Sequence, residues 1–192
     1  MSGFRILGIC GSLRRASFNM AALRAAQQLA PEGIAIEIVS PGGIPLYNDD
    51  ERAASGFPDP VTSLCRRIAE ADAVLIATPE YNYSVPGVLK NAIDWVSRAN
   101  PQPFQDKPVA IMGASPGALG TARAQYDLRK IFVFLDAHVL NRPEVMIAGA
   151  GQRFDAEGNL TDEATRKFIR TQIEALRAWA ERLRAGKPAA AS

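Results

Sequence analysis

The feature that most constrains the fold is a regular alternation of short apolar runs rich in isoleucine and valine with longer stretches of helical periodicity. Such runs are typical of strands buried on both faces, and their alternation with helices indicates a parallel sheet covered on each side. The predicted strands span residues 4–9, 34–39, 73–78, 109–113 and 138–141. The predicted helices span residues 19–29, 60–71, 85–98, 121–136 and 162–184. We therefore predict a doubly wound α/β three-layer sandwich with a five-stranded parallel sheet of order 2-1-3-4-5.

The length of 192 residues suits one domain, which we place at residues 1–184. Residues 185–192 are expected to form a disordered tail. Residues 41–60 are rich in glycine and proline and are predicted to form a long surface connection. Thr161, followed by two acidic residues, is the predicted N-cap of the last helix.

Composition excludes several classes of function. The chain has 22 basic and 20 acidic residues without a block of like charge, which gives no support for nucleic-acid or membrane-surface binding. Cys10 and Cys65 form no C-x-x-C pair and there is a single histidine, so neither a disulfide framework nor a metal site is indicated. No apolar run approaches the ~18 residues that a membrane helix needs. A cytoplasmic protein is expected.

A polar loop follows the first predicted strand and leads directly into the first helix. It contains Ser12, Arg14, Ser17 and Asn19. At a helix N-terminus, free backbone N–H groups and the helix dipole attract anions, and hydroxyl, amide and guanidinium groups add donors. The loop has neither the Walker-type G-x-x-x-x-G-K-[ST] pattern nor a complete G-x-G-x-x-G. We predict a site for a terminal phosphate, the alternative being a turn that only caps the helix.

A second unusual loop, residues 78–87, follows the third predicted strand. It contains Tyr81, Asn82, Tyr83 and two prolines. In the 2-1-3-4-5 order strands one and three are neighbours, so both loops open onto one crevice. A stiff loop with aromatic faces and exposed amides suits a flat heteroaromatic ring such as an isoalloxazine. Glu80 either orients this loop through backbone contacts or is a surface carboxylate.

Four segments together resemble one known family. They are Gly-Ser-Leu-Arg at residues 11–14, Ser-Phe-Asn at 17–19, Pro-Glu-Tyr-Asn-Tyr-Ser-Val-Pro-Gly at 79–87 and Leu-Lys-Asn-Ala-Ile-Asp-Trp at 89–95. The chain resembles the NADPH-dependent FMN reductase family, and within it the bacterial quinone and chromate reductases, from the first strand to at least Glu144. The resemblance implies a flavodoxin-like fold, a bound FMN, and NADPH or NADH as co-substrate, with NADPH favoured.

The resemblance also implies which residues hold the cofactor. The first loop would hold the phosphate, the second would line the isoalloxazine, and a third loop at residues 114–120 would approach the other side of the flavin, where its glycines permit close backbone approach. Taken alone, the third loop is a Gly/Pro turn. The implied cofactor-binding residues are Ser12, Arg14, Ser17, Phe18, Asn19, Pro79, Glu80, Tyr81, Asn82, Tyr83, Ser115 and Gly117.

Members of this family pass a hydride from the nicotinamide to flavin N5 and then reduce a second substrate in the same pocket. That chemistry requires no acid–base residue, so none is nominated. The implied acceptors are quinones, free flavin, chromate and azo compounds. A homodimer or homotetramer is implied as well, since members of the family commonly assemble in that way. Arg123, Tyr126 and Glu144 resemble the family's subunit-contact region, although they equally suit a solvated helix face.

Three other functions are weighed against this one. A flavodoxin-type electron carrier would share the fold and FMN, but such carriers usually have an acidic surface. A hydrolase would use Ser12 as nucleophile and His138, near Asp136, as base, but most lone histidines in such positions are structural. A binding or regulatory domain without turnover would not need both loop motifs.

Overall fold

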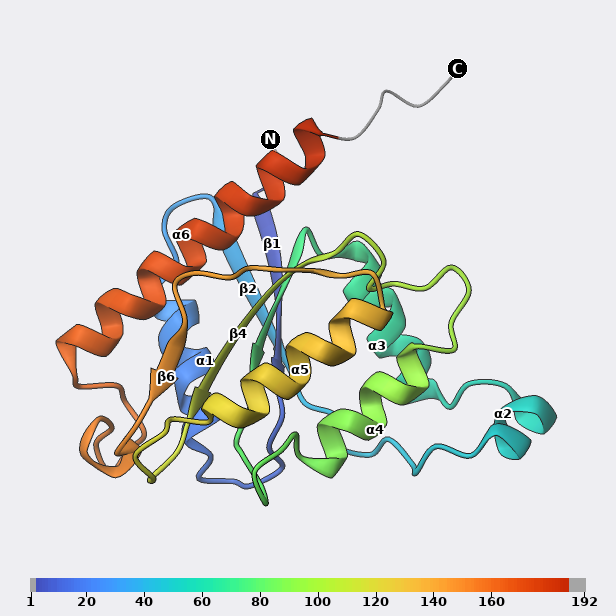
Figure 1. Cartoon of the computed structure of the whole chain (residues 1–192), viewed down its shortest axis with the longest axis horizontal. Coiled ribbons are helices and arrows are strands. Elements are labelled where there is room, and N and C mark those ends of the chain that lie inside the picture. Colours follow the sequence, from blue (N-terminus) through green and yellow to red (C-terminus); the bar gives the residue numbers. More distant parts are fainter. Residues whose placement is uncertain (1–2, 187–192) are drawn as a thin grey trace.

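The computed structural model describes residues 3–186, in which a central parallel sheet carries helices on both faces (Figure 1). The main strands are β1 (Phe4–Cys10), β2 (Ile34–Val39), β3 (Ala73–Ala77), β4 (Pro108–Ala114) and β5 (His138–Val139). Neighbouring strands run parallel in the order β2-β1-β3-β4-β5. The predicted fold class and strand order are confirmed.

The predicted number of five strands is wrong, because two short strands share the edge beside β4. β5 pairs with the first two residues of β4, and β6 (Val145–Ile147) pairs in parallel with its last three. The intervening segment includes Pro143, which has no N–H to donate to a ladder. The strand predicted at residues 138–141 therefore ends at Val139, and a separate strand begins beside the carboxyl end of β4.

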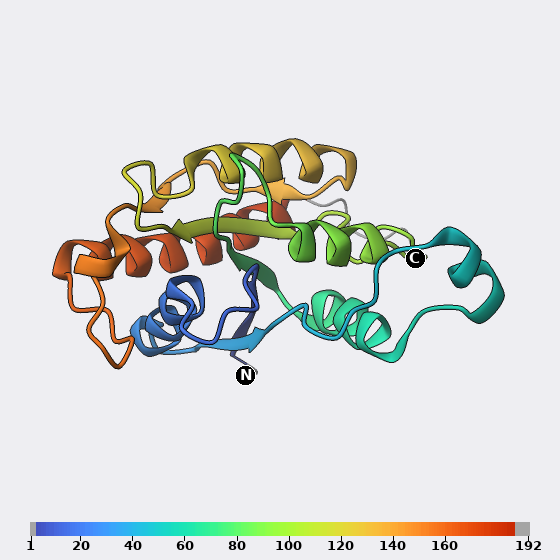
Figure 2. The same ribbon diagram turned by 90° about the horizontal axis from the view of Figure 1, so that it is seen from below.

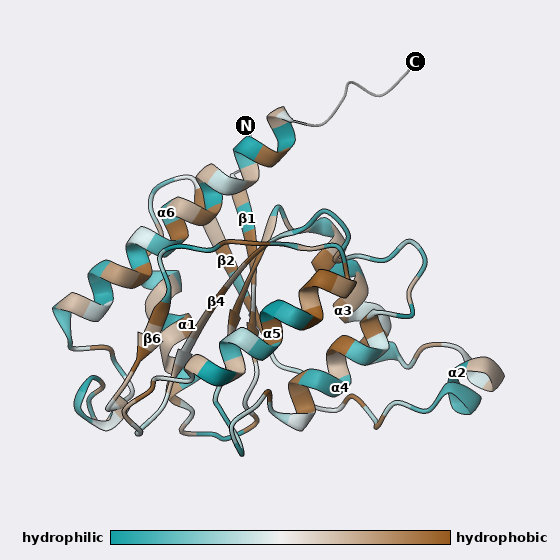
Figure 3. Cartoon of the chain, in the orientation of Figure 1, coloured by the Kyte–Doolittle hydropathy of each residue, from teal (hydrophilic) through white to brown (hydrophobic). Residues whose placement is uncertain are grey.

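The helices form two layers (Figure 2). α1 (Phe18–Leu29) and α6 (Glu163–Ala185) cover one face of the sheet, whereas α3 (Asp59–Glu70), α4 (Gly87–Val96) and α5 (Ala122–Phe134) cover the other. Alternate strand side chains supply the two cores: Ile6 and Leu75 pack on the first layer, Leu7 and Ile76 on the second. In Figure 3 the strands are coloured mainly brown for hydrophobic residues, whereas the helices carry both brown and teal residues. This is the pattern of a sheet that is buried on both faces.

Residues 41–60 are more ordered than a plain surface connection. They contain α2 (Asp49–Ser55), which projects from the body of the protein (Figure 1). Its N-cap is Asn48, whose Oδ1 accepts a hydrogen bond of 3.0 Å from the backbone of Asp50. Before α2, the carbonyl of Pro45 accepts hydrogen bonds from Asn91 Nδ2 and Trp95 Nε1 at 2.8 and 2.9 Å. These hydrogen bonds connect the segment that precedes α2 to α4.

The N-cap of α6 is Asp162 and not the predicted Thr161. Asp162 Oδ2 accepts a 2.8 Å hydrogen bond from the backbone N–H of Thr165, while the Thr161 hydroxyl donates to the carbonyl of Arg153. α6 extends to Ala185, one residue into the predicted tail, and residues 187–192 lie outside the described residues. The domain boundary stays a prediction. None of the helices within residues 3–186 is both long and apolar enough to cross a membrane.

Candidate functional site

The loops that follow β1, β3 and β4 enclose a small pocket at the carboxyl edge of the sheet, with a volume of about 90 Å³. The predicted site residues that line it are Ser12, Arg14, Ser17, Phe18, Asn19, Pro79, Glu80, Tyr81 and Ser115. Ala114 and Pro116 line it too and were not predicted. Pockets for whole cofactors measure roughly 300–1,000 Å³. The enclosed part therefore suits a phosphate-sized group, and the rest of a larger ligand would lie over the open loops.

The loop after β1 is shaped by its own hydroxyl groups. Ser17 is the N-cap of α1, and its Oγ accepts a hydrogen bond of 3.3 Å from the N–H of Met20. Ser12 Oγ accepts one of 3.3 Å from the N–H of Arg14. The amides of Phe18 and Asn19 lie in the first helical turn, where no helical acceptor exists for them. Backbone donors of α1 therefore face the same pocket as the two serines.

Arg14 supplies the positive charge of this loop. Its side chain is exposed, and among residues 3–186 it takes part in no ion pair with a carboxylate. A guanidinium with that freedom can form charge-assisted hydrogen bonds to a phosphate without first breaking a salt bridge.

Asn19 lines the pocket, and its side chain also makes contacts that the sequence did not indicate. Its side chain is buried and is committed to the end of β4: Nδ2 donates to the carbonyl of Ala114 at 3.0 Å, and Oδ1 accepts from the Ala114 N–H at 2.8 Å. The side-chain amide thus joins the first loop to the third. Nδ2 has a second hydrogen that this pair does not use, so the side chain and the backbone N–H of Asn19 both remain donors for an anion.

The loop after β3 contains a strained turn. The backbones of Tyr81 and Ser84 exchange hydrogen bonds of 3.2 and 3.1 Å, and Asn82 and Tyr83 between them have φ values of 50° and 69°. Left-handed conformations of non-glycine residues cost about 1–3 kcal/mol each and persist only where their surroundings enforce them. Tyr81 lines the enclosed pocket, whereas Asn82 and Tyr83 do not.

Glu80 holds this loop against α5. Its carboxylate accepts hydrogen bonds from the backbone N–H groups of Arg123 and Ala124 at 2.9 and 3.2 Å. Thr121 occupies the N-cap position of α5 with φ of 71° and makes no capping bond through its side chain. Glu80 therefore caps the helix from the neighbouring loop, and the negative charge suits the positive end of the helix dipole.

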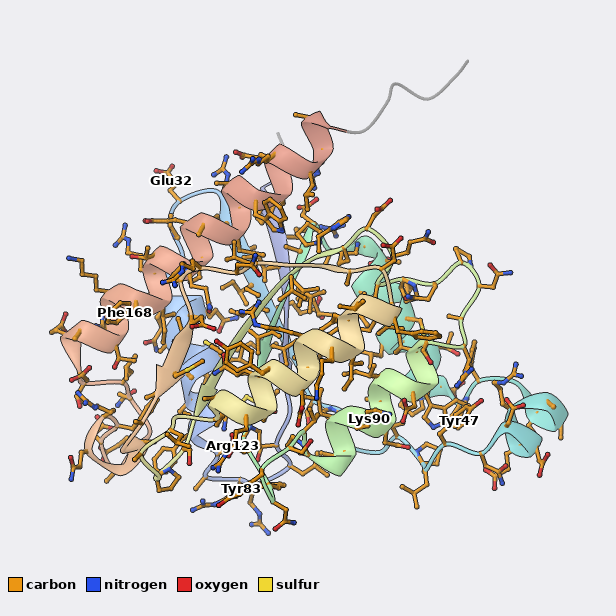
Figure 4. The ribbon with its side chains drawn as sticks, viewed as in Figure 1. Glu32, Tyr47, Tyr83, Lys90, Arg123 and Phe168 are labelled. Carbon is orange, nitrogen blue, oxygen red and sulfur yellow. The ribbon has the colours of Figure 1, made fainter. Side chains whose placement is uncertain are left out.

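Arg123 completes the same contact. Its Nε donates to Glu80 Oε1 at 2.6 Å, and its guanidinium lies 3.5 Å from the centroid of the Tyr83 ring. Figure 4 shows the two labelled side chains together at the foot of α5. Ser84 Oγ donates to Asp127 at 2.7 Å, and hydrogen bonds from Lys130 and Ser84 lower the pKa of that carboxyl. Both ends of the turn are thus bound to α5.

The third loop is held by β6, the strand that was not predicted. The N–H of Ser115 donates to the carbonyl of Ile147, and the carbonyl of Ser115 accepts from Ala150, both at 3.0 Å. Ser115 Oγ accepts from the N–H of Gly117 at 3.1 Å, and Gly117 itself does not line the pocket. The only signal for β6 in the sequence is the short apolar run Val145–Ile147, which follows Pro143 and Glu144.

The hydrolase alternative fails on topology. Ser12 lies beyond the carboxyl end of β1, whereas His138 opens β5 and pairs with Pro108 at the amino end of β4. The sheet separates them, and His138 Nε2 instead lies 3.2 Å from Asp106 Oδ1. Cys10 is buried below the first loop, where burial raises the pKa of its thiol and disfavours the reactive thiolate.

Arg123, Tyr126 and Glu144, which resemble a subunit-contact region in sequence, belong to two separate clusters of side chains. Arg123 pairs with Glu80, while the hydroxyl of Tyr126 donates to Glu144 Oε1 at 2.9 Å. The side chain of Tyr126 is exposed. These contacts lie within one chain.

Comparison with known proteins relates this site to a family. The model of the NADPH-dependent FMN reductase family matches residues 4–152. The chain is 57% identical over 180 residues to an NAD(P)H-dependent FMN reductase of Pseudomonas aeruginosa, covering 94% of this chain and 97% of the relative. It is 43% identical over 182 residues to a quinone reductase of Escherichia coli K12, covering 94% and 97%.

A solved structure agrees with these sequence relatives. FerB, a flavoenzyme NAD(P)H:(acceptor) oxidoreductase from Paracoccus denitrificans, superposes with a TM-score of 0.83 at 37% identity, covering 93% of this chain and 98% of its own. The chain therefore belongs to the NADPH-dependent FMN reductase family, and so to the oxidoreductases that work with FMN and NAD(P)H.

Proposed function

We propose that this protein is a quinone reductase that binds FMN across the three loops and uses NAD(P)H as the electron donor. One observation carries the proposal: the donor-rich start of α1 and residues 79–81 of the loop after β3 line a common pocket at the carboxyl ends of neighbouring strands. Ligands of doubly wound sheets bind at that position.

The donor set fits the phosphate of FMN. The first-turn amides of α1, the hydroxyls of Ser12 and Ser17 and the guanidinium of Arg14 converge on a pocket of phosphate size. Asn19 would contribute its backbone N–H and the Nδ2 hydrogen that is not bound to Ala114. A phosphate monoester carries two negative charges, which the helix terminus and Arg14 favour.

The turn after β3 fits the isoalloxazine ring. Pro79 and Tyr81 would face the ring. The backbone N–H groups of Glu80, Asn82 and Tyr83 would be the donors to its pyrimidine edge, because that of Tyr81 is bound to Ser84. Ser115 and Gly117 would approach from the opposite side. Bound FMN would supply the electron-accepting ring, so the chain needs to bind and orient and requires no proton-transferring side chain.

Quinones are the acceptors that the relatives support, because several of them are named quinone reductases. Free flavin is a further proposed acceptor, in line with the name of the Pseudomonas aeruginosa relative. Chromate and azo compounds rest on the resemblance of the sequence motifs alone. The azoreductase structures are 18–19% identical to this chain and indicate only the fold. A homodimer or homotetramer, and cytoplasmic location, likewise stay predictions.

The experiment that tests this function separates the enzyme from an electron carrier. Purified protein loaded with FMN is mixed anaerobically with NADPH, and separately with NADH, while the flavin absorbance near 450 nm is followed; benzoquinone is then added in slight excess. We expect rapid bleaching by at least one donor and full recovery with quinone. A flavin that is reduced by dithionite but by neither pyridine nucleotide would contradict the proposal and favour the carrier.

A further inference from the structure

The side chain of Arg123 joins two parts of the loop after β3. Its Nε and Nη2 both donate to Glu80 Oε1, at 2.6 and 2.5 Å, and its guanidinium covers the ring of Tyr83 at 3.5 Å from the centroid. Glu80 precedes the turn, and Tyr83 is one of its two left-handed residues. One side chain from α5 therefore contacts both the residue that precedes the turn and a residue within it, and Figure 4 shows Arg123 beside Tyr83.

We propose that Arg123 is a positioning residue that fixes the turn after β3 in the shape that presents its backbone to the flavin ring, and that it also neutralises Glu80 at the wall of the site. The inference rests on the proposed FMN site. It assigns Arg123 a role in tuning the flavin, and the resemblance of its sequence context to a subunit-contact region stays a separate prediction.

The first part of the argument is conformational. Tyr83 is 69% exposed, so burial in the core does not hold its left-handed backbone. The identified restraints are the Tyr81–Ser84 backbone bridge, the Ser84–Asp127 hydrogen bond and the Arg123 guanidinium over the Tyr83 ring. A planar guanidinium donates in its plane and stacks on its face at the same time, which the point charge of a lysine cannot do.

The second part is electrostatic. The side chain of Glu80 is only 8% exposed, and its residue lines the proposed cofactor pocket. Arg123 is its partner in an ion pair, and the two backbone N–H groups of α5 complete its contacts. Without Arg123, a poorly solvated negative charge would stand beside a ring that becomes more electron-rich on reduction. Reduced FMN would then lose affinity more than oxidised FMN, and the reduction potential would fall.

The test compares Arg123→Met, Arg123→Lys and the double variant Glu80→Gln/Arg123→Met with the wild type. Arg170→Met is the matched control, because Arg170 forms an exposed ion pair with Glu174 on α6, outside the cofactor pocket. Two quantities are measured: hydrogen exchange of the Tyr81 and Ser84 amides in the apoprotein, and the midpoint potential of bound FMN.

For Arg123→Met we expect exchange of both amides at least about tenfold faster, and a preference for oxidised FMN raised about tenfold, which is about 30 mV downward for a two-electron couple. Arg123→Lys should keep the potential near that of the wild type yet show the faster exchange. The double variant should recover the potential without recovering slow exchange. Arg170→Met should match the wild type in both.

Unchanged exchange and unchanged potential in Arg123→Met would overturn the inference while leaving the proposed function intact, provided that the wild type binds FMN. A wild type that binds no FMN would overturn the proposed function and the electrostatic half of the inference. Hydrogen exchange of the Tyr81 and Ser84 amides in the apoprotein would still test whether Arg123 fixes the shape of the turn. Should Arg123→Met fail to fold, Arg123→Lys alone decides, since equal exchange rates in that variant and the wild type would contradict the proposal.

Discussion

The side-chain amide of Asn19 and the backbone of Ala114 form a reciprocal pair of hydrogen bonds, at 3.0 and 2.8 Å. Asn19 lies in the first turn of α1 and Ala114 ends β4, so this pair sets the distance between the loop proposed to hold the phosphate and the loop proposed to face the ring. The sequence places the two residues 95 positions apart.

Asn19→Leu should destabilise the protein and weaken FMN binding together. It leaves the buried N–H and carbonyl of Ala114 without partners, which costs about 2–4 kcal/mol in the free energy of unfolding. Urea denaturation of the apoprotein and FMN titration measure the two effects. Gln28→Ala, an exposed change on the same helix, serves as control and should leave both within error. Loss of FMN affinity without loss of stability would mean that the side chain binds the cofactor directly.

Arg14→Met should weaken FMN and leave riboflavin unaffected, since the guanidinium is proposed to meet only the phosphate. Loss of one charge-assisted hydrogen bond costs about 1.5–3 kcal/mol, or roughly 10- to 150-fold in dissociation constant. Quenching of flavin fluorescence gives both constants. Arg142→Met, also exposed, is the control. An equal effect on FMN and riboflavin would place Arg14 against the ring and not the phosphate.

Gly113→Ala should be strongly destabilising, by about 2–4 kcal/mol. A Cβ at this position would lie 1.8 Å from Thr121 Oγ1 and 2.5 Å from the carbonyl of Thr78, so β4 and the start of α5 would have to separate. Gly151→Ala is the control, because a Cβ there meets no atom within 4 Å. Thermal melting of both variants measures the difference. A Gly113→Ala protein as stable as wild type would contradict this packing.

Acid should remove the contribution of Asp162 to stability. Hydrogen bonds from Thr165, followed by the contact with Arg153, lower the pKa of its carboxyl below the ordinary value. Because the folded pKa lies below the unfolded one, the stabilisation is complete above about pH 4 and declines as the pH falls through the folded pKa. Urea midpoints of wild type and Asp162→Asn should differ at pH 7 and converge toward pH 3. A constant difference across that range would exclude this linkage.

The sequence predicted the sheet because its signal is periodic and extends over many residues. Isoleucine and valine runs mark β1 to β4, and the apolar pattern of residues 85–98 marks α4. β6 is only three residues long, and it is stabilised by pairing with β4. A periodic pattern in the local sequence cannot indicate such a pairing between distant segments. The split of the last edge into β5 and β6 therefore appears only in the folded chain.

For the candidate site, the sequence indicated loops that the fold brings together around one pocket, but not what each side chain contacts. Hydroxyl and amide groups near the start of a helix can be recognised from the sequence as hydrogen-bond donors. Nine of the twelve predicted residues line the pocket. Asn19 turned out to be bound to β4, and Glu80 to cap α5, because their partners come from distant segments. The stacking of Arg123 on Tyr83 could not be predicted from the sequence either, because it depends on a left-handed backbone at Tyr83.

The central claim is that the start of α1 holds the phosphate of FMN while the loops after β3 and β4 hold its ring. Titration of the apoprotein with FMN and with riboflavin, followed by fluorescence quenching in one buffer, tests this most directly. The account predicts that FMN binds at least about 100-fold more tightly than riboflavin, as two or more charge-assisted hydrogen bonds would give. Equal affinity for the two flavins, or no binding of either, would contradict it.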